Sequence, residues 1–199
     1  MNWYKTAQLR ETLPYFQELK EYGEYVPQED VLNETLESMG LSIGEEINRG
    51  DSGIAYMLSN GDVLKITTNS QEGQIADTLT QNPHPSIANY KTVWKEGDLY
   101  YIIMEHLDNM VSDDQGLSNL FNNLSKIIDR EKCYAPDCAL DILTNNEYFN
   151  SLHSSVTDSI TNYLSHLVSS PFSQFSMFDF LNPANIGIKN GEIKFFDIT

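Results

Sequence analysis

Residues 41–107 contain five short apolar runs separated by turn signals, and this spacing limits the possible folds more than any other feature of the chain. Two of the runs flank Asn60-Gly61, and an Asn-Gly pair between alternating runs is a strong signal for a β-hairpin. A second hairpin is predicted around Gly97. The segment is therefore predicted to be an antiparallel sheet with one short helix over residues 72–79. The five expected strands are residues 43–47, 54–58, 63–67, 90–94 and 99–104.

The chain before this segment has the pattern of an amphipathic helix. Apolar side chains recur at helical spacing on both sides of Pro27; they are Leu9, Leu13, Phe16 and Leu19, then Leu32, Leu36 and Met39. We expect residues 1–40 to be a helical N-terminal extension with an acidic, solvated face. A docking arm for a partner is the alternative.

The chain after residue 107 returns to helical patterns and ends in two short strands. One helix is predicted over residues 116–129. The strongest pattern covers residues 147–169, where apolar residues fall on one face of a helix. The last strands are predicted at residues 186–189 and 193–196. The predicted fold class is α+β, with an extension (1–40), a sheet-rich part (41–107) and a mainly helical part (108–199).

The charge balance of the chain is strongly acidic. Its 199 residues contain 29 Asp and Glu against 12 Lys and Arg, and no Lys or Arg lies between Cys133 and Ile188. A formal net charge of −17 repels the phosphates of nucleic acids and the headgroups of anionic lipids. We therefore expect neither a nucleic acid nor a membrane as a partner.

No segment of the sequence indicates a membrane span or an export signal. No apolar run approaches the roughly 20 residues needed to cross a bilayer, and the first residues are too polar for a signal peptide. We expect a cytoplasmic protein in which Cys133 and Cys138 are reduced thiols. A zinc site with His153 and His166 is the alternative, but the spacing matches no compact zinc motif.

Two features in the predicted sheet could contact a phosphate. Gly50 and Gly53 lie between two predicted strands, and glycines let backbone amides approach phosphate oxygens closely; a plain turn is the alternative. Lys65 lies in an apolar strand, so its ammonium needs an anionic partner or solvent. A nucleotide phosphate would serve, and so would a carboxylate on the next helix, of which Glu72 is the first candidate.

Two further features lie at the ends of predicted strands. Met104, Glu105 and Leu107 mark the point where a strand runs into a short polar connector before the helical part. Such a junction is a common place for a ligand cleft. Asn185 and Asp197 bracket the last two strands, so a hairpin there could bring an amide oxygen and a carboxylate together. Oxygen ligands of this kind suit Mg²⁺.

In this order, the features resemble the protein kinase-like fold. Kinases have a Gly-rich loop, a strand lysine paired with a helix glutamate, a catalytic loop ending in Asn, and an Asp that begins D-F-G. Gly50-x-x-Gly53 resembles the Gly-rich loop, and Val63-Leu64-Lys65 resembles the lysine strand. Residues 179–185 resemble the catalytic loop, and residues 197–199 stand in the place of D-F-G. The resemblance covers residues 41–199. Short kinase-like proteins of phages and bacterial pathogens resemble the chain in being similarly reduced, and we favour this branch of the fold.

The resemblance implies ATP as the bound nucleotide, in a cleft between an N-lobe and a minimal C-lobe. ATP would lie under Gly50 and Gly53. Met104 takes the gatekeeper place, and adenine would lie against Glu105 and Leu107. The implied location is the cytoplasm, or the cytoplasm of a host cell.

The resemblance also implies Mg²⁺ and phosphotransfer to a protein hydroxyl. Lys65 would hold the α- and β-phosphates, and Glu72 would orient it. Asn185 and Asp197 would hold Mg²⁺, and Asp179 would be the catalytic base.

The sequence departs from the family pattern at several points. Asp179 precedes Asn185 by six residues, one more than in the motif H-R-D-x-x-x-x-N. Glu72 follows Lys65 closely, and only two residues follow Asp197, without an activation loop or the later helices of a peptide-substrate platform. These departures leave open a catalytically inactive pseudokinase that presents an acidic surface to a basic partner protein. An unrelated α+β domain is the third alternative.

Overall fold

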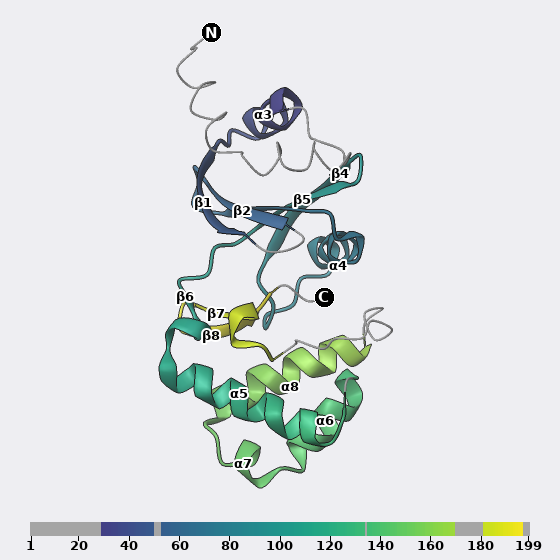
Figure 1. Ribbon diagram of the computed structural model, residues 1–199, viewed down its shortest axis with the longest axis vertical. Coiled ribbons are helices and arrows are strands. Elements are labelled where there is room, and N and C mark those ends of the chain that lie inside the picture. The colour runs from purple at the N-terminus through teal and green to yellow at the C-terminus, as the bar shows by residue number, and fades with distance from the viewer. Residues whose placement is uncertain (1–28, 50–52, 134, 170–180, 197–199) are drawn as a thin grey trace. The chain divides into compact units, whose positions relative to one another are not determined.

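The computed structural model of the protein describes residues 29–49, 53–133, 135–169 and 181–196 (Figure 1). These residues form a five-stranded sheet, a three-stranded sheet and six α-helices. The chain divides into two units, the first with residues 1–77 and 90–106 and the second with residues 78–89 and 107–199. The predicted α+β class is therefore confirmed.

The first unit is built on the five-stranded antiparallel sheet that the sequence predicts. The strand order is β1-β2-β3-β5-β4, and all neighbouring strands are antiparallel. The turn between β2 and β3 places Gly61 at φ +84°, a left-handed conformation that favours glycine. This requirement explains why the Asn-Gly signal predicts the hairpin correctly. The strands are β1 (Ile43–Arg49), β2 (Gly53–Leu58), β3 (Val63–Thr67), β4 (Tyr90–Glu96) and β5 (Leu99–Met104).

One face of this sheet packs against helix α3 (Glu29–Ser38). Leu32 and Leu36 of α3 are buried in one cluster with side chains of the sheet, including Tyr56 and Leu64. The leucines that the sequence analysis assigns to an N-terminal extension are therefore part of the core of the first unit. The predicted helix over residues 1–28 lies outside the described residues.

The opposite face of the sheet carries helix α4 (Ser70–Gln81). Side chains alternate along a strand, so Leu64 points toward α3 and its neighbour Lys65 points toward α4. Figure 1 shows the two helices on either side of the sheet. The alternation of the strand thus decides that Lys65 lies beneath a helix.

The second unit is mainly helical and carries the three-stranded sheet β6-β7-β8. Phe195 of β8 stacks on Tyr163 with ring centroids 3.9 Å apart, and Phe121 meets Phe195 edge-on at 6.3 Å. These rings join the last hairpin to the helices. The elements are β6 (Asn109–Met110), α5 (Gln115–Arg130), α6 (Pro136–Thr144), α7 (Glu147–Asn150), α8 (Ser154–Ser169), β7 (Ile186–Lys189) and β8 (Glu192–Phe195).

The single helix predicted over residues 147–169 is wrong, because the chain forms α7 and α8 with a break between them. Each helix has its own N-terminal cap. Asn146 Oδ1 accepts a hydrogen bond from Phe149 N–H at 3.2 Å, and His153 Nδ1 accepts one from Ser155 N–H at 3.3 Å. Capping side chains satisfy the first N–H groups of a helix, so α7 begins after Asn146 and α8 begins anew after His153. Helix α6 is not predicted by the periodicity; it begins at Pro136, a residue favoured at the first helical position.

The expectation of two reduced thiols is also wrong in this structure. Cys133 and Cys138 form a disulfide, with their Cα atoms 6.0 Å apart. The turn between α5 and α6 brings the two residues to a separation that a disulfide can bridge. The bond therefore links the segment just after α5 to the first turn of α6.

No helix among the described residues is long and apolar enough to span a membrane.

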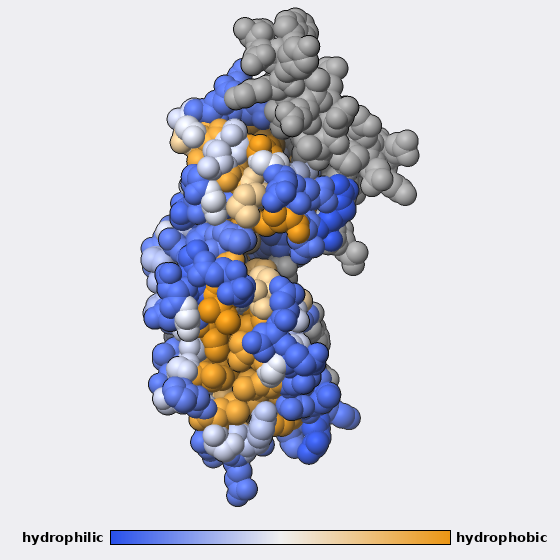
Figure 2. All heavy atoms as spheres, turned by 90° about the vertical axis from the view of Figure 1, so that its left-hand side faces the viewer, coloured by the Kyte–Doolittle hydropathy of each residue, from blue (hydrophilic) through white to orange (hydrophobic). Residues whose placement is uncertain are grey.

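Figure 2 shows hydrophobic side chains gathered on one face of the second unit, flanked by hydrophilic ones.

Candidate functional site

Lys65 of β3 and Glu72 of α4 form an ion pair in the first unit. Only 16% of the Lys65 side chain and 6% of the Glu72 side chain are exposed. Partial burial reduces the screening of the two charges by water. The sequence predicts this pairing, and the structure confirms it. The alternative of a solvent-facing lysine is wrong, because α4 covers the face of the sheet to which Lys65 points.

The segment between β3 and α4 places the glutamate. Thr67 Oγ1 accepts a hydrogen bond from Asn69 N–H at 3.1 Å. Asn69 Oδ1 in turn accepts from Gln71 N–H at 3.0 Å and from Glu72 N–H at 3.3 Å. Asn69 therefore caps α4, and Glu72 lies in the first helical turn, where the helix dipole favours a carboxylate. Sequence reasoning missed this cap, although an Asn directly before a helical run is a usable signal.

The lysine is held from both sides by its position in the sheet. Lys65 pairs with Ala55 on β2 and with Ile102 on β5. A residue in a central strand has its backbone fixed by two ladders of hydrogen bonds. The seven-residue separation between Lys65 and Glu72 is therefore bridged by a rigid strand, a short connection and one helical turn.

The approach of α4 to the sheet depends on Gly73. A Cβ atom on Gly73 would overlap the ring of Tyr100 on β5, lying 2.6 Å from Cε1 and closer still to Cγ and Cδ1. The missing side chain thus lets the first turns of α4 lie directly against the aromatic ring. Sequence reasoning missed this contact, since no local pattern pairs residue 73 with residue 100.

Gly53 is the first residue of β2 and lies opposite Thr67 of β3. A Cβ atom there would overlap the carbonyl oxygen of Ile66 and lie 3.2 Å from Thr67 Cα. Close approach of the two strands therefore explains this glycine without a ligand. Gly50 lies outside the described residues, so the phosphate-cradling role of the two glycines stays a prediction.

The predicted adenine-contacting residues fall on both sides of the division between the units. Met104 ends β5, is buried, and pairs with Val63 of β3. Glu105 follows it and is half-buried. Leu107 belongs to the second unit, where it packs on Gly187; a Cβ atom on Gly187 would lie 2.9 Å from Leu107 Cβ.

Asn185 ends a short 3₁₀ turn (Pro183–Asn185) and directly precedes β7. The β7–β8 hairpin pairs Ile186 with Phe195, and the backbone carbonyl of Asn185 accepts a hydrogen bond from Phe196 N–H at 3.0 Å. The predicted hairpin is present, and it brings Asn185 beside the residue that precedes Asp197. Asp197 lies outside the described residues, as does Asp179.

Asp108 fixes this hairpin to the chain that follows β5. Its Oδ1 accepts from Lys189 Nζ at 2.9 Å, and its Oδ2 accepts from Asn190 N–H at 3.0 Å. The backbone N–H of Asp108 donates to Ile188 O at 2.8 Å. Sequence reasoning missed Asp108, because its partners are about 80 residues away in the chain.

His84 stacks on His166 of α8 in the second unit, with ring centroids 4.3 Å apart and an interplanar angle of 21°. Burial lowers the pKa of both imidazoles, and the neighbouring His166 and Lys194 lower the pKa of His84 further. Lys194 is held beside this pair, since its ammonium donates to Pro85 O. Burial of the stacked rings therefore disfavours the charged form of both histidines.

Within the part of the chain that the structure describes, no group of three or more His, Cys, Asp and Glu side chains could hold a metal ion. A comparison of the sequence with models of protein families gives no match, and neither does a comparison with curated proteins. The residues described above are therefore the basis for a functional assignment.

Proposed function

We propose that the protein has a protein kinase-like fold and binds ATP with Mg²⁺, with phosphotransfer to a protein hydroxyl as its reaction. The observation that carries this proposal is the partly buried ion pair between Lys65 of the central strand β3 and Glu72 of helix α4. The same five-stranded antiparallel sheet supports the assignment. A lysine in such a strand has little use for folding alone, since removing its charge from water is costly.

Lys65 suits a phosphate because its ammonium carries three N–H donors. Glu72 holds the ammonium at a fixed place above the sheet. In the proposal, Lys65 binds the α- and β-phosphate oxygens, and Gly50 and Gly53 let backbone amides approach the phosphates. Adenine lies against residues 105–107, with Met104 in the gatekeeper place.

The proposed metal ligands are Asn185 and Asp197, whose oxygen atoms are of the kind that Mg²⁺ prefers. The hydrogen bond between Asn185 O and Phe196 N–H supports this, because it holds the two ends of the hairpin together. Bound Mg²⁺ would neutralise charge on the phosphates. In the transfer, the hydroxyl oxygen bonds to the γ-phosphorus, the bond from that phosphorus to the bridging oxygen breaks, and ADP leaves. Asp179 accepts the hydroxyl proton.

A thermal-shift titration of the full chain with ATP, with and without Mg²⁺, tests the proposal. ATP at 100 times its dissociation constant should add about 2.7 kcal/mol to the free energy of unfolding. Lys65→Met should weaken ATP binding by about tenfold to a hundredfold, since hydrogen bonds to charged groups are worth about 1.5–3 kcal/mol.

Lys91→Met is the matched control. Lys91 lies on β4 of the same sheet and forms an ion pair with Asp62 at 2.7 Å, so the variant removes the same charge and also breaks a lysine–carboxylate pair. It should leave ATP affinity nearly unchanged. Absence of any ATP-dependent shift, or an equal loss of affinity in both variants, would contradict the proposal.

An inactive pseudokinase is the second candidate function, favoured by the extra residue between Asp179 and Asn185. A misplacement of about 1 Å at a catalytic group can cost a hundredfold in rate. Transfer of labelled phosphate from ATP to the protein itself or to a basic acceptor protein, lost in Asp197→Ala, supports the kinase. Binding of ATP without any transfer supports the pseudokinase.

A further inference from the structure

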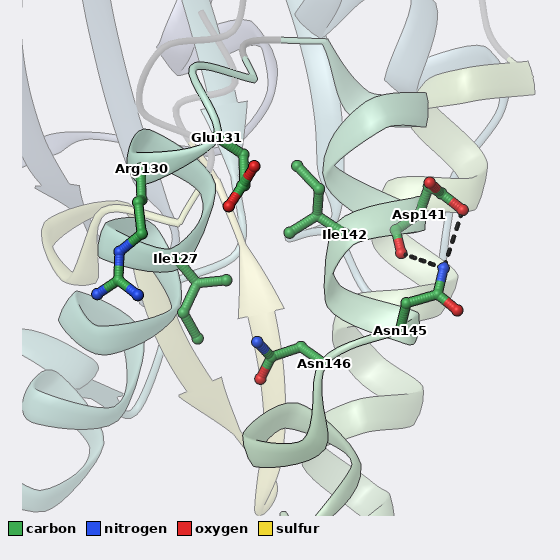
Figure 3. Close-up of a pocket in the computed structure, with 7 residues that line it drawn as sticks. All are labelled: Ile127, Arg130, Glu131, Asp141, Ile142, Asn145 and Asn146. Atoms are coloured by element: carbon green, nitrogen blue, oxygen red, sulfur yellow. Dashed lines mark hydrogen bonds between the residues drawn. The ribbon is translucent and has the colours of Figure 1, made fainter.

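A groove lies in the second unit between the C-terminal ends of α5 and α6, with a volume of about 340 Å³ (Figure 3). Ile127 of α5 and Ile142 of α6 face each other across it. Both isoleucines are half-buried. The groove therefore has two apolar walls, and an aliphatic chain could pack between them.

Polar groups stand at the two ends of these walls. The Glu131 carboxylate is turned into the space between the helices, and the Asn146 amide enters it from the other end. Asn146 Oδ1 accepts from Phe149 N–H, so its NH₂ group is the end that can donate to an occupant. Glu131 thus offers an anionic acceptor and Asn146 a neutral donor; Asp141 and Arg130 also line the groove.

The electrostatics of the groove favour a cation. Glu131 is the C-cap of α5 and Asn145 is the C-cap of α6, so the negative ends of two helix dipoles meet there. Asp141 adds a second carboxylate at the outer edge, where it accepts from Asn145 Nδ2 at 3.1 Å. Among the described residues Glu131 forms no ion pair, and Figure 3 shows the Arg130 guanidinium turned away from it.

The same features select a side chain of a protein over a free small cation. A lysine or arginine has an aliphatic stem for the isoleucine walls and a charged head for Glu131. The peptide carbonyls beside it can accept from Asn146. A free amino acid would bring its own carboxylate against an acidic surface, whereas in a peptide that group is an uncharged amide.

We propose that the α5–α6 groove receives a lysine or arginine side chain from a basic segment of a partner protein. The aliphatic stem lies between Ile127 and Ile142, and the cation pairs with Glu131. This site lies within the second unit and does not depend on nucleotide binding.

Titration of the ¹⁵N-labelled full chain with a blocked pentapeptide that contains one central arginine tests the proposal. Saturable chemical-shift changes should concentrate at the backbone amides of Ile127, Glu131, Ile142 and Asn146. The same peptide with citrulline, an uncharged analogue of arginine, should cause no saturable change. Glu131→Gln should weaken the arginine peptide by about threefold to tenfold, the range expected for one partly exposed charge contact.

Asp158→Asn is the matched control, because Asp158 is an exposed acid of α8 that does not line the groove. It removes the same charge and should leave the affinity nearly unchanged. Ile142→Ala, which shortens one wall, should also weaken the peptide while the protein stays folded by circular dichroism.

Three results would overturn the proposal. The first is a loss of peptide affinity in Asp158→Asn equal to that in Glu131→Gln. The second is a set of chemical-shift changes spread over the whole acidic surface. The third is binding of the citrulline peptide as tightly as the arginine peptide. Tighter binding of spermidine than of the peptide would assign the groove to a small polyamine instead. Self-association lost in Glu131→Gln would assign it to a second copy of the chain. ATP affinity should be the same in Glu131→Gln as in the unaltered protein, so this result and the nucleotide test are independent.

Discussion

Gly73→Ala should destabilise the protein, although the same change in an ordinary helix is stabilising. Alanine in place of glycine inside a helix contributes about 0.5–1 kcal/mol, because glycine has more backbone freedom to lose on folding. At Gly73 the new Cβ would overlap three ring atoms of Tyr100, two of them, Cγ and Cδ1, at the base of the ring. Rotation of the ring about its own axis leaves Cγ in place, so α4 or β5 has to move.

Inserting a methyl group into a packed contact costs about 1–3 kcal/mol. Tyr100 is also held by Lys95, whose ammonium lies 5.1 Å from the ring centroid, and such an interaction contributes about 0.5–1 kcal/mol at an exposed site. After subtraction of the helix gain, Gly73→Ala should lower the free energy of unfolding by about 1–2 kcal/mol. Since Glu72 is the adjacent residue, the displaced helix should also loosen the ion pair with Lys65.

A double-mutant cycle measured by urea unfolding checks this reasoning. In the background Tyr100→Ala the obstacle is absent, so Gly73→Ala should become stabilising by about 0.5–1 kcal/mol. The sign of the effect therefore depends on residue 100, and the coupling free energy should reach about 1.5–3 kcal/mol. Stabilisation by Gly73→Ala in the presence of Tyr100 would refute the close-contact explanation.

Two further predictions concern the second unit. Burial lowers the folded-state pKa of His84 and His166, so below pH about 6.5 the unfolded chain binds more protons. The free energy of unfolding should therefore fall as the pH drops from about 6.5 through the lower folded pKa. His166→Phe keeps a stacked ring and should reduce this slope in urea unfolding; an unchanged slope would contradict the assignment. Cys138→Ser opens the loop closed with Cys133 and should cost about 2 kcal/mol by the loop-entropy relation, a difference that should disappear when both proteins are unfolded in a thiol reductant.

The strands and their hairpins are predictable from the sequence because their signals are local. Each of these signals depends on residues close together in the sequence. They are the Asn-Gly turn, the alternation in β3 and the apolar runs of β4 and β5. The helical break at residues 151–153 is not predictable from local signals, because apolar spacing continues across it. Only the caps at Asn146 and His153 show that there are two helices. Helix α6 was not predicted, because its sequence has no long apolar periodicity.

Some features of the candidate site are likewise predictable from local sequence signals, and others are not. The pairing of Lys65 with Glu72 is predictable because both lie near one strand–helix connection. The contact of Gly73 with Tyr100 and the link from Asp108 to Lys189 join segments far apart in the chain, and no local pattern indicates them.

The sequence by itself indicated the five strands of the first sheet and the last two strands, and it placed a lysine inside one strand with an acid seven residues further along the chain. The tertiary structure alone decided that α3 and α4 cover opposite faces, which sets Leu64 in the core and Lys65 beneath a helix. It also decided that the ends of α5 and α6 meet around Glu131. The physical reason is that periodicity reports which face of an element is apolar, whereas the neighbour that covers this face is chosen by packing of the whole chain.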